Sequence, residues 1–129
     1  MTGAPRGLSG RHPIDGYGAG GFQFGGMSHR GSLIALPSGL YPWSVRSVSD
    51  LSVASLSGVF VEAGEIDHLL LGMGADFAIP DDAVVAACRA RRIVAEPMAT
   101  AAAARTYNIL LGERRRVAAA LIVPGSLAP

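Results

Sequence analysis

The feature that most constrains the fold is the stretch Glu96–Pro124, in which an alanine-rich segment leads into an uncharged apolar one. Ala101–Leu111 carries apolar residues at helical spacing and is followed by Gly112, so it predicts a helix with Thr100 as its N-cap. Every residue of Val117–Val123 is apolar. Both faces of a strand formed there would be buried, which predicts a central strand in a sheet covered on both sides.

Length and composition limit the class of protein. The chain has 129 residues, of which 50% are hydrophobic and 16% charged, and this balance predicts one globular domain. We expect an N-terminal tail over residues 1–13, a single α/β domain over 14–124 and a C-terminal tail over 125–129. Eleven basic and ten acidic residues give a net charge of +1, so no nucleic acid or anionic membrane is expected as a partner.

The cysteine content and the apolar runs bear on the compartment. Cys88 is the single cysteine and cannot form an internal disulfide, which favours a reducing environment. The sequence lacks the run of about 18 apolar residues that a transmembrane helix needs, and residues 1–13 lack the apolar region of a secretory signal. We therefore expect a cytoplasmic protein without a transmembrane segment.

The first third of the chain predicts an antiparallel β layer, because short apolar runs alternate with glycine clusters. The expected strands are Ile14–Tyr17, Phe22–Phe24, Ser32–Leu36 and Leu40–Val45. Pro37-Ser38-Gly39 is typical of a hairpin turn. Pro42 has no amide hydrogen to donate, so its strand should lie at a sheet edge or carry a bulge.

The remainder predicts helices alternating with strands. The expected elements are a helix from an N-cap at Asp50 to Glu62, a strand at Ile66–Leu71, a helix from about Asp82 to Arg91 and a strand at Ile93–Glu96. With the strand at Val117–Val123, these elements predict a three-layer α/β domain. In that domain the N-terminal β layer and the first helix would cover one face of the sheet, and the later helices the other.

A candidate site follows from this topology. If the strands at Ile66 and Ile93 run parallel, their carboxyl ends and the N-termini of the next helices meet at one edge of the sheet, where α/β proteins usually bind ligands. The crevice would be lined by Gly72, Gly74, Asp76, Met98 and Thr100. Arg105, one turn into the helix, would reach an anion there, or an interaction surface would form from Arg105 and Asn108. The residues alone leave open the alternative that Thr100 only caps the helix and that both other side chains meet water.

No catalytic or metal-binding set stands out in the sequence. The three histidines are scattered without partners at ligand spacing, so no metal is expected. Gly72 and Gly74 match the first glycines of a dinucleotide fingerprint, but Phe77 stands where the third glycine belongs, so a glycine turn is the simpler interpretation and no cofactor is expected. Arg114–Arg116 either meet water or contribute to a basic patch.

Four segments together resemble one known family. They are YGAGGFQFGG, RGSLIALPSGLYPW, LLLGMGADFAIP and EPMATAAAARTYNILLGERRRVAAALI, and the similarity extends from about Ile14 to Pro124. They are similar to the Mth938-like family of small α/β proteins, which includes relatives of a mitochondrial respiratory complex I assembly factor. The resemblance implies a three-layer Mth938-like fold with a central mixed sheet and an N-terminal β layer.

The resemblance also implies a function. A non-enzymatic binding or assembly-accessory protein is expected, with a protein partner linked to respiratory complex I assembly. The alternative is a small anionic-ligand-binding protein or enzyme that uses the crevice near Gly72, Thr100 and Arg105. Relatives often carry an acidic residue near Ala99 and a cysteine near Ala104, and this chain has alanine at both positions. A reaction that needed those two side chains would therefore be missing here.

Overall fold

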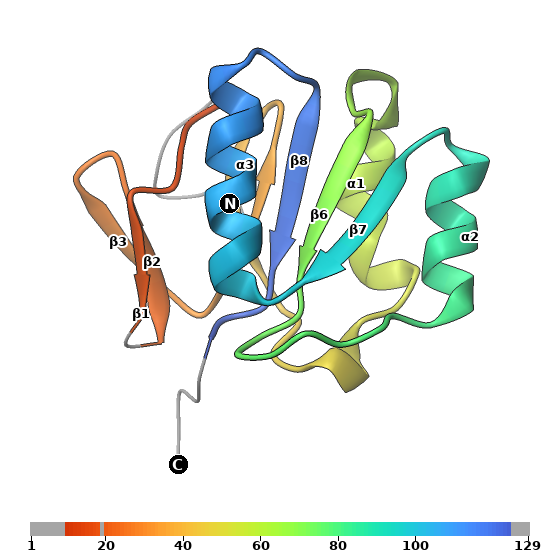
Figure 1. The fold of residues 1–129 in the computed structure, drawn as a ribbon, viewed down its shortest axis with the longest axis horizontal. Coiled ribbons are helices and arrows are strands. Elements are labelled where there is room, and N and C mark those ends of the chain that lie inside the picture. Colours follow the sequence, from red (N-terminus) through yellow and green to blue (C-terminus); the bar gives the residue numbers. More distant parts are fainter. Residues whose placement is uncertain (1–9, 19, 125–129) are drawn as a thin grey trace.

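The computed structural model describes residues 10–18 and 20–124, which form two sheets and three α-helices (Figure 1). The larger sheet has the strand order β5-β4-β8-β6-β7. Its strands are β4 (Ser32–Leu36), β5 (Gly39–Trp43), β6 (His68–Gly72), β7 (Val94–Met98) and β8 (Val117–Leu121). β6 runs parallel to β7 and β8, whereas β4 runs antiparallel to β5 and β8, so the sheet is mixed as predicted.

β8 is the central strand, as its apolar sequence predicted. All five of its residues are buried, and Leu121 and Ile122 are 0% and 2% exposed. Successive side chains of a strand point to opposite faces, so β8 contributes to two separate cores. Ala118 and Ala120 belong to one core, and Val117, Ala119 and Leu121 to the other.

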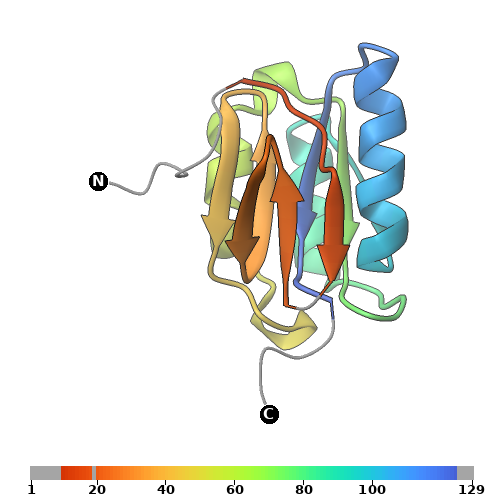
Figure 2. The same cartoon turned by 90° about the vertical axis from the view of Figure 1, so that its left-hand side faces the viewer.

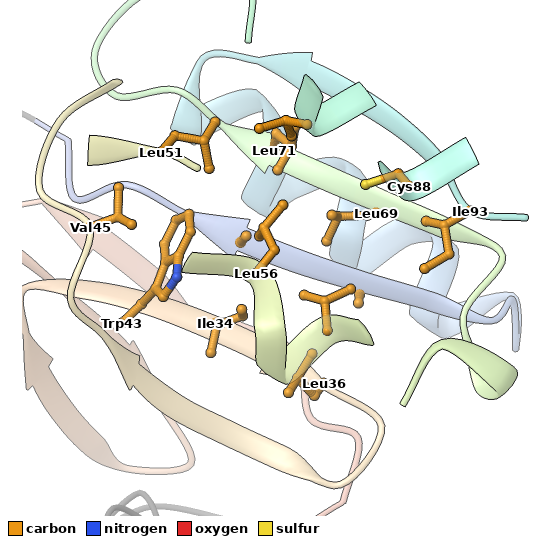
Figure 3. Packing of buried hydrophobic residues seen from close by; sticks show 14 of the residues in the cluster. Ile34, Leu36, Trp43, Val45, Leu51, Leu56, Leu69, Leu71, Cys88 and Ile93 are labelled. Atoms are coloured by element: carbon orange, nitrogen blue, oxygen red, sulfur yellow. The ribbon is translucent and has the colours of Figure 1, made fainter. Parts of the chain in front are cut away.

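Each face of the large sheet has its own cover. On one face lie the short helix α1 (Ser57–Val61) and α2 (Asp82–Ala90), which enclose a core that contains Trp43, Leu56, Leu69 and Cys88 (Figure 3). On the other face, α3 (Thr100–Gly112) lies beside the three-stranded sheet, and the two share a core with Phe22 and Phe24 (Figure 2). The domain therefore has three layers, the large sheet being the middle one.

The N-terminal β layer is smaller than predicted. It consists of β1 (Gly16–Gly18), β2 (Gly21–Phe24) and β3 (Met27–Arg30), paired antiparallel in that order. β3 was not predicted, because its sequence MSHR is mostly polar and shows no apolar alternation. The predicted hairpin through Pro37 and Ser38 exists, but its strands β4 and β5 extend the large sheet.

The predicted helix from Asp50 to Glu62 was wrong in length and position. The segment forms short 3₁₀ turns at Val48–Asp50, Ala54–Leu56 and Ala63–Glu65, with only α1 as α-helix, and it lies on the face opposite the small sheet. Ser52 and Ser55 explain the interruption. Each backbone N–H donates to the other residue's hydroxyl, at 3.0 and 3.1 Å, and such local bonds compete with helical ones. Asp50 does not act as the N-cap, because it lies within a 3₁₀ turn and accepts a bond from the Arg46 N–H.

Both longer helices end at an arginine in the left-handed backbone conformation. After α3, Arg114 has φ 63°, its N–H donates to the Leu111 carbonyl, and the Arg115 N–H donates to the Leu110 carbonyl. After α2, Arg92 has φ 62°, its N–H donates to the Arg89 carbonyl, and the Ile93 N–H donates to the Cys88 carbonyl. These are Schellman motifs, in which glycine usually takes the left-handed position. Gly112, the predicted stop, is instead the last helical residue.

Both outer strands of the large sheet contain a proline. In β5, Leu36 and Gly39 flank a two-residue loop, so alternation along the hairpin turns the backbone of Pro42 away from β4. In β7, the Val94 N–H donates to the Asp67 carbonyl and the Met98 carbonyl accepts from the Met73 N–H, so both residues bond toward β6. Because alternate residues of a strand bond to opposite sides, the backbone of Pro97 faces the open edge. The edge position predicted for Pro42 is thus confirmed, and each proline removes a donor only where no neighbouring strand would receive it.

Candidate functional site

The carboxyl ends of β6 and β7 meet the N-terminus of α3 at one rim of the large sheet (Figure 1). Thr100 joins α3 to the loop after β6 and to the end of β8. Its hydroxyl donates to the Ile122 carbonyl at 2.6 Å and accepts from the Gly74 N–H at 2.9 Å, while its own N–H donates to the Gly74 carbonyl at 2.8 Å. Thr100 is fully buried. It is the first residue of α3 rather than the predicted N-cap, a position taken by Ala99, because its hydroxyl bonds across the rim instead of along the helix.

Gly72 allows α3 to approach the sheet closely. A Cβ atom at this position would lie 2.9 Å from the Thr100 hydroxyl oxygen and 2.9 Å from a Leu121 methyl carbon. It would also lie 3.1 Å from the Thr100 Cα atom, which belongs to the backbone. The first two distances are shorter than real Cβ atoms show and the third is unusually tight, so the glycine is needed for packing.

The loop between β6 and α2 forms the exposed part of the rim. Gly74 is buried at a φ of 105°, and Asp76 is exposed. Phe77 and Ile79 are also exposed, at 61% and 75%. Met98, at the end of β7, is half-buried. Phe77 stood out in the sequence only as the residue in place of a third glycine, yet the nearby Ile79 and Pro80 were a signal for an apolar loop.

Arg105 and Asn108 lie in different surroundings. Arg105 is exposed on α3. Asn108 lies about 12 Å along the helix from Thr100, where its side-chain oxygen accepts from the Ile14 N–H at 2.8 Å and its amide donates to the Ile14 carbonyl at 2.6 Å. The Asn108 side chain therefore fixes the segment before β1 to α3. Of the predicted site residues, the structure brings Gly72, Gly74, Met98 and Thr100 together, leaves Asp76 and Arg105 exposed nearby and places Asn108 apart.

Two side chains with potential chemistry are enclosed by the fold. The Tyr107 hydroxyl donates to the His12 carbonyl at 3.1 Å, and burial raises the pKa of Tyr107 to about 12, an effect that nearby Arg11 partly offsets. Burial likewise raises the pKa of the Cys88 thiol, and Arg91 opposes the shift. A protonated, buried thiol and phenol are poor nucleophiles and poor bases near neutral pH.

Several hollows of the described part of the chain lie away from the rim. One of about 550 Å³ lies over the small sheet and includes His29 and Arg30, and one of about 490 Å³ lies between β5 and α1. A third, of about 440 Å³, is lined by Arg11, Glu65, Leu111, Arg114, Arg115 and Arg116. The last three arginines are adjacent in the sequence, but Arg11 precedes them by more than 100 positions and Glu65 by 49 to 51 positions. No sequence pattern therefore places Arg11 and Glu65 beside them.

Residues 10–18 and 20–124 contain neither a metal-ligand cluster nor a membrane-spanning helix. Within those ranges no three His, Cys, Asp or Glu side chains are grouped as a metal site would require. In the same part of the chain, no helix has both the length and the apolar character needed to cross a bilayer.

The architecture is that of a small three-layer α/β domain with a mixed sheet, in which the hydrogen bonds of Thr100 join the segments at one rim. The chain belongs to the family described as "Protein of unknown function (DUF498/DUF598)", whose model matches residues 14–122. The predicted family relationship is thereby confirmed.

Curated relatives include both bacterial and animal proteins. An uncharacterized protein of Rhodobacter capsulatus is 43% identical over 127 residues, covering 96% of this chain and 97% of the relative. NADH dehydrogenase [ubiquinone] 1 alpha subcomplex assembly factor 3 of Danio rerio is 37% identical over 108 residues, or 84% of this chain. The chain spans only 62% of the length of that assembly factor.

Solved structures share the fold. A crystal structure described as an outer membrane protein from Bartonella henselae matches with a TM-score of 0.88 and 39% identity, covering 92% of this chain and all of that one. The solution structure of a Bordetella pertussis protein, described as a Mth938-like domain, matches with a TM-score of 0.78 at 24% identity and covers 98% of this chain and 94% of its own. The predicted Mth938-like fold is confirmed.

Proposed function

We propose that this chain is a non-enzymatic assembly-accessory protein that binds a protein partner and contributes to the assembly of respiratory complex I. The observation that carries the proposal is the 37% identity to an assembly factor for NADH dehydrogenase over 84% of this chain. Because the chain spans 62% of that relative, the role of the whole relative is transferred here only as a hypothesis.

The chemistry of the described side chains supports binding rather than turnover. The Thr100 hydroxyl, the Asn108 amide and the Tyr107 hydroxyl are each engaged in internal hydrogen bonds. Phe77 and Ile79, by contrast, expose apolar surface on the loop beside the rim. Exposed aromatic and aliphatic side chains next to a rigid edge are suited to anchoring a protein partner. The proposed partner surface therefore comprises this loop with Asp76, Met98 and Arg105. The buried Gly72, Gly74 and Thr100 support it from behind, and Asn108 lies apart from it.

The proposal is tested by affinity capture from the native cell, followed by mass spectrometry. We expect the chain to recover subunits or assembly intermediates of NADH dehydrogenase, and the double variant Phe77→Ser/Ile79→Ser to recover several-fold less. Ile109→Ser is the matched control, because Ile109 is 56% exposed on α3 away from the loop. Recovery of no respiratory component by the unchanged chain would refute the assembly role. Equal recovery by the double variant would refute the loop as the contact.

A second candidate function is binding of a small anion at the rim. The parallel pairing of β6 with β7 favours it, because this pairing gathers the carboxyl ends of the strands beside the N-terminus of α3. Arg105 would supply the cation. A thermal-shift screen with nucleotides, inorganic phosphate and small carboxylates tests this function, with NMR shifts at Gly74 and Arg105 as the site-specific readout. A screen without saturable effects would eliminate it.

We also propose that the protein works in the cytoplasm, on the basis of its single buried thiol. The Bartonella henselae relative described as an outer membrane protein makes the question worth testing. Cell fractionation with an antibody to the chain would decide, and recovery in the outer-membrane fraction would refute this location.

A further inference from the structure

The arginine pocket is the hollow of about 440 Å³ lined by Arg11, Glu65, Leu111, Arg114, Arg115 and Arg116. Its cations come from the segment before β1 and from the turn between α3 and β8. We propose that this pocket binds a short acidic segment of a protein partner. The inference rests on the proposed binding function and names one contact of it.

Two of the arginines are held in place by the fold. Arg116 donates to the Gly64 carbonyl, and its Nε atom lies 3.3 Å from a carboxylate oxygen of Asp67. Arg11 donates to the Glu65 carbonyl at 3.3 Å. Arg11 and Arg116 thus hold the pocket wall against the turn that precedes β6, and each commits part of its hydrogen-bonding capacity there.

The side chains of Arg114 and Arg115 keep their hydrogen-bonding groups available within the described part of the chain. Among the residues that the structure describes, neither the Arg114 nor the Arg115 guanidinium makes a hydrogen bond or an ion pair. Both backbones are fixed by the Schellman motif that ends α3, so the two side chains start from defined positions. Each guanidinium presents planar N–H pairs that match a carboxylate. Among the described residues that line the pocket, four are arginines and only Glu65 is acidic, so this lining has a net positive charge.

The surroundings favour a short acidic peptide over a long polyanion. The whole chain carries only +1, Glu113 directly precedes Arg114 in the sequence, and Asp67 contacts Arg116. These carboxylates would repel the extended phosphate array of a nucleic acid or the surface of an anionic membrane. A pocket of this size accommodates one or two carboxylate side chains. Leu111 gives it an apolar part suited to the methylene groups of glutamate.

The test uses the full chain and a fluorescein-labelled hexaglutamate peptide as probe, with fluorescence anisotropy as the readout. We expect saturable binding that weakens as salt is added. Arg114→Gly should weaken binding several-fold, and Arg114→Glu/Arg115→Glu by roughly tenfold or more, because both reversed charges would face the ligand. Arg114→Gly should fold at least as well as the parent chain, since glycine is favoured at this φ.

Arg92 provides a matched control. It has the same left-handed conformation at the end of α2, it is exposed, and it does not line the pocket. Arg92→Gly and Arg92→Glu should leave peptide binding unchanged. No binding of the peptide by the parent chain, or equal losses in the Arg92 and Arg114 variants, would overturn the proposal. Binding to phosphatidylserine vesicles or single-stranded DNA in place of the peptide would overturn it too.

The assembly role can be separated from this inference. If Arg114→Gly still captures components of NADH dehydrogenase at the parent level, the assembly role stands and the pocket is not the contact. If the peptide binds at the pocket but no respiratory component is captured, the pocket stands and the assembly role fails.

Discussion

Thr100→Val is the substitution that most directly tests the account of the rim. Valine has nearly the same shape as threonine but lacks the hydroxyl, so the change removes hydrogen bonds with little change in volume. The hydroxyl bonds to the Gly74 N–H at 2.9 Å and to the Ile122 carbonyl at 2.6 Å, and the site is fully buried. Both backbone groups would therefore lose a partner where water cannot easily replace it.

The cost can be worked out from those two bonds. A buried polar group left unsatisfied costs about 1–3 kcal/mol, so two groups predict a loss of about 3 kcal/mol in the free energy of unfolding. For a domain of this size the melting temperature should fall by about 10 °C. The fluorescence of Trp43, the single tryptophan, follows unfolding in urea, because Trp43 packs in the core under α1.

Thr100→Ser is the matched control, since serine keeps the hydroxyl and loses only a methyl group. It should cost about 1 kcal/mol. A Thr100→Val loss below about 0.5 kcal/mol would refute the role of the hydroxyl as the link between α3, β8 and the loop after β6. Equal losses for valine and serine would assign the effect to the methyl group instead.

Three further predictions concern single residues. Gly72→Ala should lower the free energy of unfolding by about 1–3 kcal/mol, because the new Cβ atom would press on Thr100. Gly112→Ala is the control: Gly112 lies in a helix with open space around it, so the change should be neutral or stabilise by up to about 1 kcal/mol in the same urea assay. Equal effects of the two substitutions would contradict the packing argument. Absorbance at 295 nm should show a tyrosine that ionises near pH 12 and disappears in Tyr107→Phe. Because folding raises the pKa of Tyr107 from 10.0, the contribution of this residue to stability is complete below about pH 10 and is lost between about pH 10 and 12. An unchanged absorbance titration curve in Tyr107→Phe would refute the assignment. The Cys88 thiol should react with a thiol reagent only as fast as the protein opens, because it is 0% exposed, and rapid reaction of the native protein would contradict its burial.

The parts of the fold that the sequence predicted best are those where apolar pattern and burial coincide. Val117–Val123 has no polar residue, and no other position in an α/β sheet suits such a strand. The edge position of Pro42 followed from its missing donor. The parallel arrangement of β6 and β7, assumed from the alternation of strand and helix, is present.

The errors arose where local polar bonds or distant contacts decide the structure. The reciprocal bonds of Ser52 and Ser55 interrupt a segment whose apolar spacing alone predicts a helix. Asn108 seemed to be a surface residue because its partner, Ile14, lies 94 positions away. Arg114 takes the left-handed position that glycine would be expected to take, which apolar periodicity does not reveal.

The candidate site was predicted in part for the same reasons. Thr100 and Gly74 were correctly placed together, because the ends of parallel strands determine which loops meet. Their direct bonding was not foreseen, since a threonine before a helix usually caps it. The arginine pocket depends on Arg11 approaching a turn more than 100 residues later in the chain, a contact for which the sequence offers no periodic signal.

The prolines at both margins of the large sheet bear on how the protein behaves at high concentration. Half of its residues are hydrophobic, and its mean hydropathy is +0.35, so transiently exposed strands would readily recruit further copies. Pro42 and Pro97 deprive an incoming strand of a hydrogen bond on either side. Neither margin can then serve as a regular template for fibril growth, and the chain can carry so apolar an interior with less risk of stacking into filaments.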